Sequence, residues 1–253
     1  MANGLQGRVA LVTGGGRGIG RAISLALAED GADVAVNFRR DREAAEDAVA
    51  RIEAMGRRAR AYRASVDSWD DDRAMVDAVV DDLGPVDILV NNAGTASRGL
   101  SIADTDPAEL EGVIRAHALG PHYLCKLVMP GMRSRPRGDV VMISSTATVF
   151  MAANGAPYNM GKAALEALAL TLAKEERRNG VRVNVVLPGL VETEMGRRLV
   201  KAMGVEDITT MHARSPFGQV CQPSDVAAVV RFLVSDQAGY VSGQRIRVDA
   251  GTT

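Results

Sequence analysis

The chain has 253 residues, 47% hydrophobic and 24% charged, which is the composition of an ordinary globular protein. Its formal net charge of −1 offers no basic field for nucleic acid or an anionic membrane, and no stretch reaches the roughly 18 uncharged apolar residues that span a bilayer. Cys125 and Cys221 fit neither a metal-ligand spacing nor a disulfide framework, and no signal peptide precedes the first strand, so we expect a cytoplasmic protein.

Short apolar runs alternate along the chain with longer helical patterns, without an internal repeat or a long linker. Strands are predicted over 8–13, 33–38, 59–63, 86–91, 139–144, 181–187 and 245–248, and helices over 19–30, 41–55, 69–82, 107–132, 157–179 and 224–235. Glycines follow four of these helices, where a positive φ is favoured: Gly31, Gly56, Gly84 and Gly180. The alternation predicts a doubly wound α/β fold, whose parallel sheet binds ligands at the carboxyl ends of its strands. The acidic segment 67–82 is interpreted as a solvated face.

A glycine-rich stretch, TGGGRGIG (13–20), joins the first predicted strand to the first predicted helix. Glycines let the backbone turn tightly and approach a pyrophosphate without Cβ clashes, and the start of a helix adds partial positive charge. The pattern is T-G-x-x-x-G-x-G rather than G-x-G-x-x-G. By position alone, a plain glycine-rich turn is therefore the alternative to a dinucleotide site.

The residues after the second strand bear on which nicotinamide cofactor would bind. A site that prefers NAD places an acid there for the ribose hydroxyls, whereas this chain has Phe38. Arg39 follows it, and Arg17 lies inside the glycine turn. Two guanidinium groups suit the 2′-phosphate of NADP, and two solvated surface arginines are the alternative. The pattern favours NADP, with NAD as the second choice.

A tyrosine and a lysine stand four residues apart in YNMGK, so Tyr158 and Lys162 would share one helix face. A nearby ammonium favours the phenolate, and a lowered pKa makes a tyrosine a useful general acid/base. The serines of ISS end the preceding strand, and Ser145 could bind the substrate oxygen that Tyr158 protonates. Y-x-x-x-K alone is usually two amphipathic residues, and NNAG (91–94) alone could be any Asn-Gly turn. The occurrence of these motifs together is far more specific than any one of them alone.

These motifs, in order from Gly7 to Gly251, resemble those of the short-chain dehydrogenase/reductase family: TGGGRGIG, NNAG, ISS, YNMGK, NVVLPGLVET and VDAG. The chain is similar to the single-domain members, including those that act as 3-oxoacyl-[acyl-carrier-protein] reductases. The resemblance implies one Rossmann-type domain over 1–253, the strand order 3-2-1-4-5-6-7, and a substrate lid over about 192–220. It also implies assembly as a homotetramer, or a dimer, through the fourth and fifth helices. The small residues Ala163, Ala164 and Ala167 would permit that packing, and core packing explains them equally well.

The resemblance assigns roles to particular residues. Tyr158 would be the acid/base, Ser145 would orient the substrate oxygen, and Lys162 would bind the nicotinamide ribose and lower the pKa of the tyrosine. Val191 and Thr193 would hold the carboxamide. The expected cofactor-binding residues are Gly14, Arg17, Gly18, Ile19, Gly20, Asn37, Arg39, Ser65, Val66, Asn92, Ala93, Gly94, Tyr158, Lys162, Pro188, Gly189, Val191 and Thr193.

Three positions depart from the family pattern. The aspartate usual near the adenine is Ser65, and the closing D-G-G reads D-A-G, with Ala250 in the middle. The third departure is His117, which stands where the family has a catalytic asparagine within a bent fourth helix. No second ligand stands at a suitable spacing in that helix, so we expect no metal site. The imidazole is either a structural substitute or a member of the proton relay.

The sequence thus predicts an NADP-dependent oxidoreductase that interconverts a carbonyl and an alcohol of a small molecule by hydride transfer. The substrate is not readable, although Met195, Met203, Met211 and Phe217 in the lid suggest an adaptable apolar pocket, with core packing as the alternative. A 3-oxoacyl-thioester reductase is the runner-up. Members that use a carrier protein commonly have a basic residue before the glycine at 180, where this chain has Asn179, next to Arg178. A cofactor-binding regulator without turnover is the rival from another class.

Overall fold

A parallel sheet of seven strands runs through residues 4–253, the part of the chain that the computed structural model describes. Its order is β3-β2-β1-β4-β5-β6-β7, which confirms the predicted Rossmann-type topology. The strands are β1 (Val9–Val12), β2 (Asp33–Phe38), β3 (Ala59–Arg63), β4 (Ile88–Asn91), β5 (Gly138–Ile143), β6 (Val181–Pro188) and β7 (Arg245–Val248). The strand order reverses between β1 and β4, and the carboxyl ends of these two strands form the place where such sheets bind ligands.

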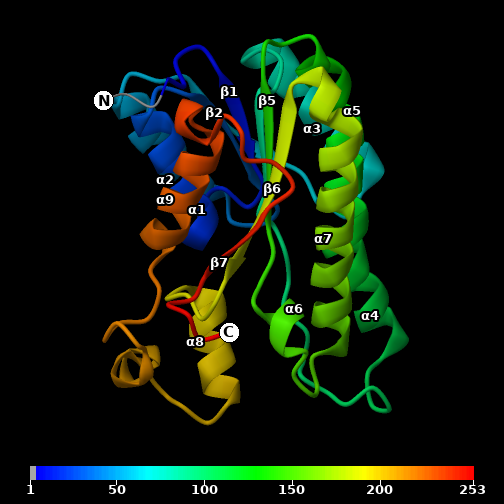
Figure 1. Cartoon of the computed structure of the whole chain (residues 1–253), viewed down its shortest axis with the longest axis vertical. Helices are drawn as coiled ribbons and strands as arrows, with labels where there is room; N and C mark the ends of the chain where they lie inside the picture. Colours follow the sequence, from blue (N-terminus) through cyan, green and yellow to red (C-terminus); the bar gives the residue numbers. More distant parts are fainter. Residues whose placement is uncertain (1–3) are drawn as a thin grey trace.

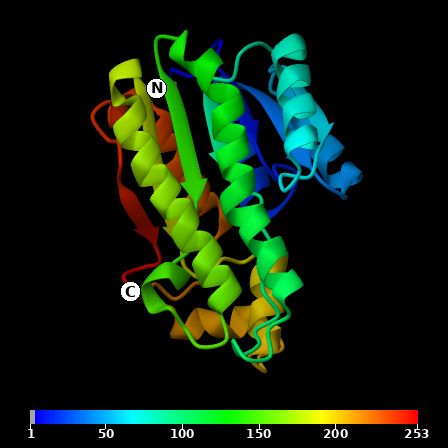
Figure 2. The ribbon, with the colours of Figure 1, turned by 90° about the vertical axis from the view of Figure 1, so that its right-hand side faces the viewer.

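Helices cover both faces of the sheet (Figure 1). On one side lie α1 (Gly18–Glu29), α2 (Arg42–Ala54) and α9 (Pro223–Val234), and on the other α3 (Trp69–Asp82), α5 (Gly120–Arg133) and α7 (Ala156–Glu176). Figure 2 shows α5 and α7 side by side in front of the sheet. Because both faces are covered, β1, β2, β4, β5 and β6 are buried along their whole length, and two apolar clusters fill the two helix–sheet layers.

The predicted helix boundaries hold closely where glycine ends a helix. Gly31, Gly56, Gly84 and Gly180 all have positive φ, between 73° and 110°, as expected of residues just after a helix. The helix predicted over 157–179 ends as a 3₁₀ turn (Arg177–Asn179) before Gly180. This 3₁₀ turn contains no predicted site residue.

The helix predicted over 107–132 is present, but it is not α-helical throughout. The segment consists of α4 (Pro107–Ile114), a π-helical turn (Arg115–Leu119) and α5, and His117 lies in the π turn. A π turn takes one residue more per hydrogen-bonded ring than an α-helix, so the apolar positions on either side keep nearly helical spacing. This irregular turn stands where the family resemblance predicted a bend.

The acidic segment is not wholly a solvated face, as the sequence suggested. Asp72 points into the molecule and is fully buried, and neither of its carboxylate oxygens has a hydrogen-bond partner among the described residues. The pKa of Asp72 is raised to about 8, chiefly by burial and also by the nearby carboxylates of Asp71 and Asp67. We therefore correct the interpretation for this one residue of α3.

The predicted lid contains α8 (Glu194–Ala202) and a 3₁₀ segment (Ile208–Arg214), which sequence patterns did not reveal. It has a small apolar core of its own, in which Val200, Ile208 and Val220 are buried. Met195, Met203 and Phe217 are exposed, whereas Met211 packs against this small core. In Figure 1, α8 and the short helix α6 (Ala147–Phe150) lie beyond the carboxyl ends of the strands. Among residues 4–253, no helix is both long enough and apolar enough to cross a bilayer.

Candidate active site

The glycine turn between β1 and α1 is built on close backbone contacts. A Cβ atom at Gly20 would lie 2.2 Å from the carbonyl oxygen of Gly14, so no larger residue fits there. Gly14 and Gly18 both have positive φ. Helix α1 begins without a side-chain cap and without an acid in its first turn, which leaves the N–H groups at Gly18, Ile19 and Gly20 to face an anion.

Polar side chains from the neighbouring strands brace this turn. Asn37, which is buried at the end of β2, accepts a hydrogen bond from the Gly14 N–H (3.2 Å) and donates to the carbonyl oxygen of Ala64 (3.1 Å). Asn92 donates to the carbonyl oxygen of Thr13 (2.8 Å), and the Thr13 hydroxyl accepts from the N–H groups of Asn92 and Ala93 (2.9 Å each). NNAG is therefore no isolated turn, because it fixes the glycine turn.

Two predicted arginines lie at the mouth of this region. The Arg17 guanidinium pairs with Glu194 of α8 (3.2 Å), an exposed ion pair that costs little to exchange for a phosphate. Arg39 is exposed and has no hydrogen-bond or ion-pair partner within residues 4–253. The buried Phe38 ring occupies the place of an acid, and the Arg42 guanidinium lies 5.3 Å from its centre. Sequence analysis missed Arg42, since a basic residue starting a helix carries no distinctive pattern.

The segment after β3 is arranged differently from the family pattern. The Ser65 hydroxyl donates to the Asp67 carboxylate (2.5 Å), and the Ser65 N–H donates to Asp71 (3.0 Å). The backbone of Val66 lies directly against α5, where a Cβ at Gly120 would be 2.0 Å from the Val66 carbonyl oxygen. A carboxylate thus stands beside Ser65, although two positions later than the family places one.

The structure brings together the three residues predicted to perform the chemistry. Ser145 lies two residues after the end of β5, and Tyr158 lies in the first turn of α7. A hydrogen bond joins their side chains. Lys162, one turn further along α7, is buried, and its ammonium donates to the carbonyl oxygen of Ile143 (2.7 Å). Its Nζ lies 5.7 Å from the centre of the Tyr158 ring.

Burial dominates the electrostatics of this group. It raises the pKa of Tyr158, and the hydrogen bond with Ser145 partly opposes that rise. It lowers the pKa of Lys162 to about 7, and the charge of Glu166 partly opposes that fall. In the chain alone, Ser145 and not Lys162 is the group that favours the phenolate, so the predicted effect of the lysine on Tyr158 stays a prediction.

His117 is buried directly beside the tyrosine. Its ring is perpendicular to that of Tyr158, with centres 5.3 Å apart, and its Nε2 lies 2.7 Å from the carbonyl oxygen of Thr95. Gly94 and Gly161 make room for it, since a Cβ at either position would come within 2.3 and 3.0 Å of its atoms. The pKa of His117 is lowered to about 3, chiefly by burial and also by the charge of Lys162, against the opposing effect of the bond to Thr95.

The loop after β6 completes the predicted set. Pro188 accepts a hydrogen bond from the Thr146 N–H (3.0 Å), and Gly189 donates to Val248 (3.0 Å). Thr193 caps α8 by accepting from the Gly196 N–H (3.0 Å), and a Cβ at Gly18 would contact its side chain at 3.4 Å. Val191 bridges to Cys221. All predicted residues thus lie at one edge of the sheet.

Comparison with known proteins shows which family this geometry belongs to. A family model described as Enoyl-(Acyl carrier protein) reductase matches residues 14–253. Versicolorin reductase 1 from Aspergillus parasiticus is 37% identical over 98% of this chain and 97% of its own length, and the 3-oxoacyl-[acyl-carrier-protein] reductase FabG from Staphylococcus aureus is 35% identical over 96% of both. The chain belongs to the short-chain dehydrogenase/reductase family.

Solved structures of this family agree with the fold over nearly the whole chain. A short-chain dehydrogenase from Burkholderia cenocepacia, in complex with NADP, has a TM-score of 0.88 at 34% identity and covers 98% of both chains. An NAD⁺-bound xylitol dehydrogenase has a TM-score of 0.91 at 30% identity, covering 98% of this chain and 100% of that one. As a member of the family, the chain is an oxidoreductase that uses a nicotinamide cofactor.

The residues of this short-chain dehydrogenase/reductase fit such a cofactor. The glycine turn has no room for a Cβ at Gly20, and α1 begins beside it without a side-chain cap and without an acid in its first turn. The buried Lys162 ammonium, next to Tyr158, has donors to spare for ribose hydroxyls. These features fit a pyrophosphate at the glycine turn and a ribose near the lysine.

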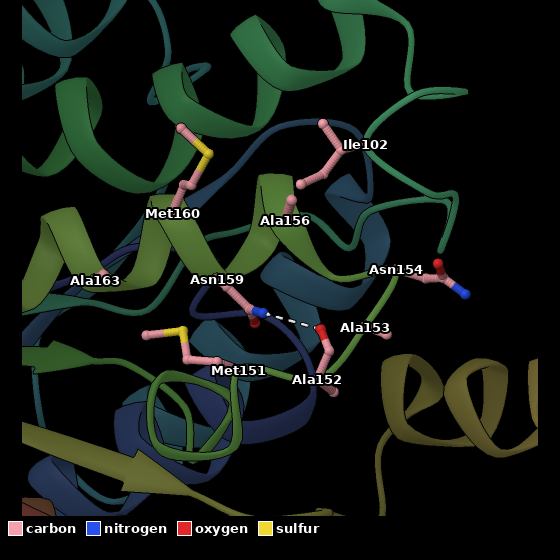
Figure 3. A pocket seen from close by; sticks show the side chains of 9 residues that line it. All are labelled: Ile102, Met151, Ala152, Ala153, Asn154, Ala156, Asn159, Met160 and Ala163. Atoms are coloured by element: carbon pink, nitrogen blue, oxygen red, sulfur yellow. Dashed lines mark hydrogen bonds between the residues drawn. The ribbon is translucent and has the colours of Figure 1, made fainter.

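An apolar pocket of about 440 Å³ lies on the outer side of the reductase's α7, beside the loop that follows α6 (Figure 3). Ile102, Met151 and Met160 line it, and Asn159 donates to the Ala152 carbonyl oxygen (3.3 Å) at its floor. Ala163 also lines it. Further along the same helix Ala167 is exposed, so core packing does not account for this residue, whereas Ala163 and Ala164 are partly buried.

Proposed function

We propose that this short-chain dehydrogenase/reductase interconverts a carbonyl and a secondary alcohol, with Tyr158 as the general acid/base. The observation that carries the proposal is the buried Lys162, bonded to the Ile143 carbonyl oxygen (2.7 Å) and 5.7 Å from the centre of the Tyr158 ring, at the ligand-binding edge of the sheet. The family assignment supports the reaction class, and the roles of the individual side chains are part of the proposal.

Each side chain contributes one step. The bound nicotinamide would supply or accept the hydride at the substrate carbon. Tyr158 donates its phenolic proton to the substrate oxygen in reduction and accepts it in oxidation. Ser145 donates a hydrogen bond to the same oxygen and holds it within reach of the phenol. Lys162, held by its hydrogen bond to the Ile143 carbonyl oxygen, places a positive charge near the tyrosine. This charge stabilises the phenolate form of Tyr158.

We propose NADP as the preferred cofactor, with NAD as the alternative. Phe38 leaves no acid for the ribose hydroxyls, and the exposed Arg39 is free to bind a 2′-phosphate. Arg17 and Arg42 lie nearby as further guanidinium groups. One related structure holds NADP and another holds NAD⁺, so the support comes from these side chains and not from relatives.

The substrate class is proposed from the lid. Met195 and Leu199 of α8, and Met203 directly after it, recur at every fourth residue and are exposed, which suits a small apolar molecule rather than a sugar. A 3-oxoacyl-thioester reductase is the second candidate, favoured by the FabG relative and by Arg178. The absence of a basic side chain at Asn179 weakens it.

For the assembly we propose a homotetramer or a homodimer, supported by the uncovered small residues on α7 around Ala167. The free thiols of Cys125 and Cys221 support the cytoplasm as the compartment. Nucleic acid and membranes are not proposed as partners, because the net charge is only −1.

One experiment tests the function directly. We expect the purified chain to oxidise NADPH in the presence of at least one member of a panel of ketones, quinones and 3-oxoacyl thioesters. Turnover confined to the thioesters would select the second candidate. Tight NADPH binding without turnover of any panel member would favour a cofactor-binding regulator instead.

A further inference from the structure

A buried carboxylate lies behind the catalytic group, and no step proposed above uses it. Glu166 stands one helical turn after Lys162 on α7, and only 5% of it is exposed. A buried charge is costly unless it is paired and hydrogen-bonded, so its partners indicate what it stabilises. Those partners come from the segment after β5, from α6 and from β7.

The first oxygen of Glu166 holds the loop that carries Ser145. Ser144 donates its hydroxyl to Oε1 (2.6 Å), and the Thr148 hydroxyl lies at the same distance from it. The Thr148 hydroxyl also lies 2.9 Å from the carbonyl oxygen of Ser145. Residues on both sides of Ser145 are thereby anchored to one carboxylate.

The second oxygen of Glu166 pairs with an arginine from the edge of the sheet. The Arg245 guanidinium, on β7, lies 2.6 Å from Oε2. The Arg245 side chain is 44% exposed, whereas that of Glu166 is 7% exposed. The pair therefore has one end at the surface and one end in the core, and Arg245 compensates the buried negative charge.

Inside the molecule, the charge of Glu166 acts on Lys162, one turn earlier on α7, and raises the pKa of that lysine. The titratable groups around the lysine are Tyr158 and Glu166 on α7 and His117 on the π turn, with Arg245 behind Glu166. His117 is neutral at neutral pH because burial and the charge of Lys162 lower its pKa to about 3. Glu166 is accordingly the acid that favours the charged lysine.

We propose that Glu166 is a positioning residue for the catalytic group. One oxygen fixes the Ser145 loop, and the carboxylate charge, compensated by Arg245, holds Lys162 in its protonated state. The inference deepens the proposed function, and its part that concerns Lys162 does not require turnover.

The charge of Lys162 can be measured without substrate or cofactor. The chain contains four lysines, and the other three, Lys126, Lys174 and Lys201, are exposed. An NMR titration of the protein with ¹³C at the lysine ε-carbons would follow Lys162 by itself, with Lys162→Met to assign its signal. Glu166→Gln and Arg245→Gln are the informative variants, because they remove opposite charges from the same pair.

The two variants should shift the Lys162 titration midpoint in opposite directions. Glu166→Gln removes a negative charge, so the midpoint should fall by about 1 pH unit. Arg245→Gln removes a positive charge, so the midpoint should rise, by about half a unit since the arginine is partly exposed. Thr148→Val removes a hydroxyl but no charge, and should leave the midpoint within about 0.3 units.

The directions decide the proposal. A merely structural ion pair would lower the stability of both variants and leave their Lys162 midpoints equal to that of the parent. If the two midpoints shift in the same direction, or do not shift, the proposal is overturned. If Glu166→Gln fails to fold, an unmoved Lys162 midpoint in Arg245→Gln would by itself overturn the proposal. Opposite shifts in a protein that turns over no substrate would sustain the network and refute the proposed function. In an active enzyme, the ionisation of Lys162 in the pH profile of turnover should move with the NMR midpoint.

Discussion

The imidazole of His117 is tied to the backbone of Thr95, with 2.7 Å between Nε2 and the carbonyl oxygen. In the tautomer that carries its proton on Nε2, the ring donates to that carbonyl, as an amide side chain could. Nδ1 is then a buried acceptor with no partner among the described residues. The histidine ties the π turn to the loop that follows the NNAG segment, which is a structural task.

Replacing His117 by asparagine tests this interpretation. We expect His117→Asn to keep turnover within about tenfold of the parent, which is less than about 1.4 kcal/mol in the barrier. The reason is that the pKa of His117 is lowered to about 3 by burial and by Lys162, so the ring stays neutral at neutral pH and contributes no proton. The measurement is the pH profile of turnover for both proteins.

The competing outcome is that the imidazole belongs to a proton relay. An ionisation near 6.5, the usual pKa of histidine, would then appear in the parent profile and vanish in His117→Asn. A loss of activity in His117→Asn as deep as in Tyr158→Phe would make the histidine catalytic.

The phenol of Tyr158 is tested by removing only its hydroxyl. In Tyr158→Phe we expect NADPH to bind with nearly the parent dissociation constant while turnover falls by about 10²-fold or more, the scale of general acid/base catalysis. Ring contacts with His117 survive the change, so the fold should remain intact. Fluorescence titration with NADPH and steady-state turnover provide the two numbers. Turnover within a few-fold of the parent would remove Tyr158 from the mechanism.

We expect the cofactor preference to depend on the arginines after β2. Arg39 is exposed and lies next to the buried Phe38, so we expect NADPH to bind at least about tenfold more tightly than NADH, or about 1.4 kcal/mol. Arg39→Asp supplies an acid for the ribose hydroxyls and should shrink or invert that ratio. Dissociation constants for both cofactors, measured at one ionic strength, check it. Arg51→Asp, at an exposed position in the last turn of α2, is the matched control. Equal constants in the parent protein would contradict the assignment.

Much of the fold can be predicted from the sequence because the two kinds of pattern that indicate it, apolar runs and glycines at helix ends, are local. Apolar runs and helix-ending glycines place the strands and four helix ends within one or two residues. The π turn around His117 escapes such reasoning, since one extra residue barely changes helical spacing. The lid helices escape it as well, because the small core around Val200 is assembled from residues distant in sequence.

The catalytic group is predictable for a different reason. Ser145, Tyr158 and Lys162 have chemistry that stands out at their spacing, and the fold brings them together. Glu166 has no such signal, because an acid four residues after a lysine on a helix is usually a surface ion pair. Its burial and its partner Arg245 depend on the way that α7 packs against β7, which no local pattern encodes.

Asp72 likewise differs from its acidic neighbours only through the packing of α3, and this has a consequence for stability. Its pKa, usually near 4, is raised to about 8 in the folded chain, chiefly by burial. Between these values the folded state keeps a proton that the unfolded state has released, so the free energy of unfolding falls as pH rises from about 4 to about 8. Above pH 8 the charged carboxylate remains buried without a partner and the destabilisation is complete.

Replacing Asp72 by asparagine keeps the shape of the side chain and removes the carboxyl group that titrates. We expect the stability of Asp72→Asn relative to the parent to grow between pH 5 and pH 9, by at least about 1 kcal/mol. In thermal unfolding this corresponds to about 3 °C for a chain of this size. Asp70→Asn, at an exposed position in the same helical turn, should change stability by a similar amount at both pH values. Parallel pH dependences of the parent and Asp72→Asn would show that the carboxyl of Asp72 titrates normally, and that α3 opens to let water reach it.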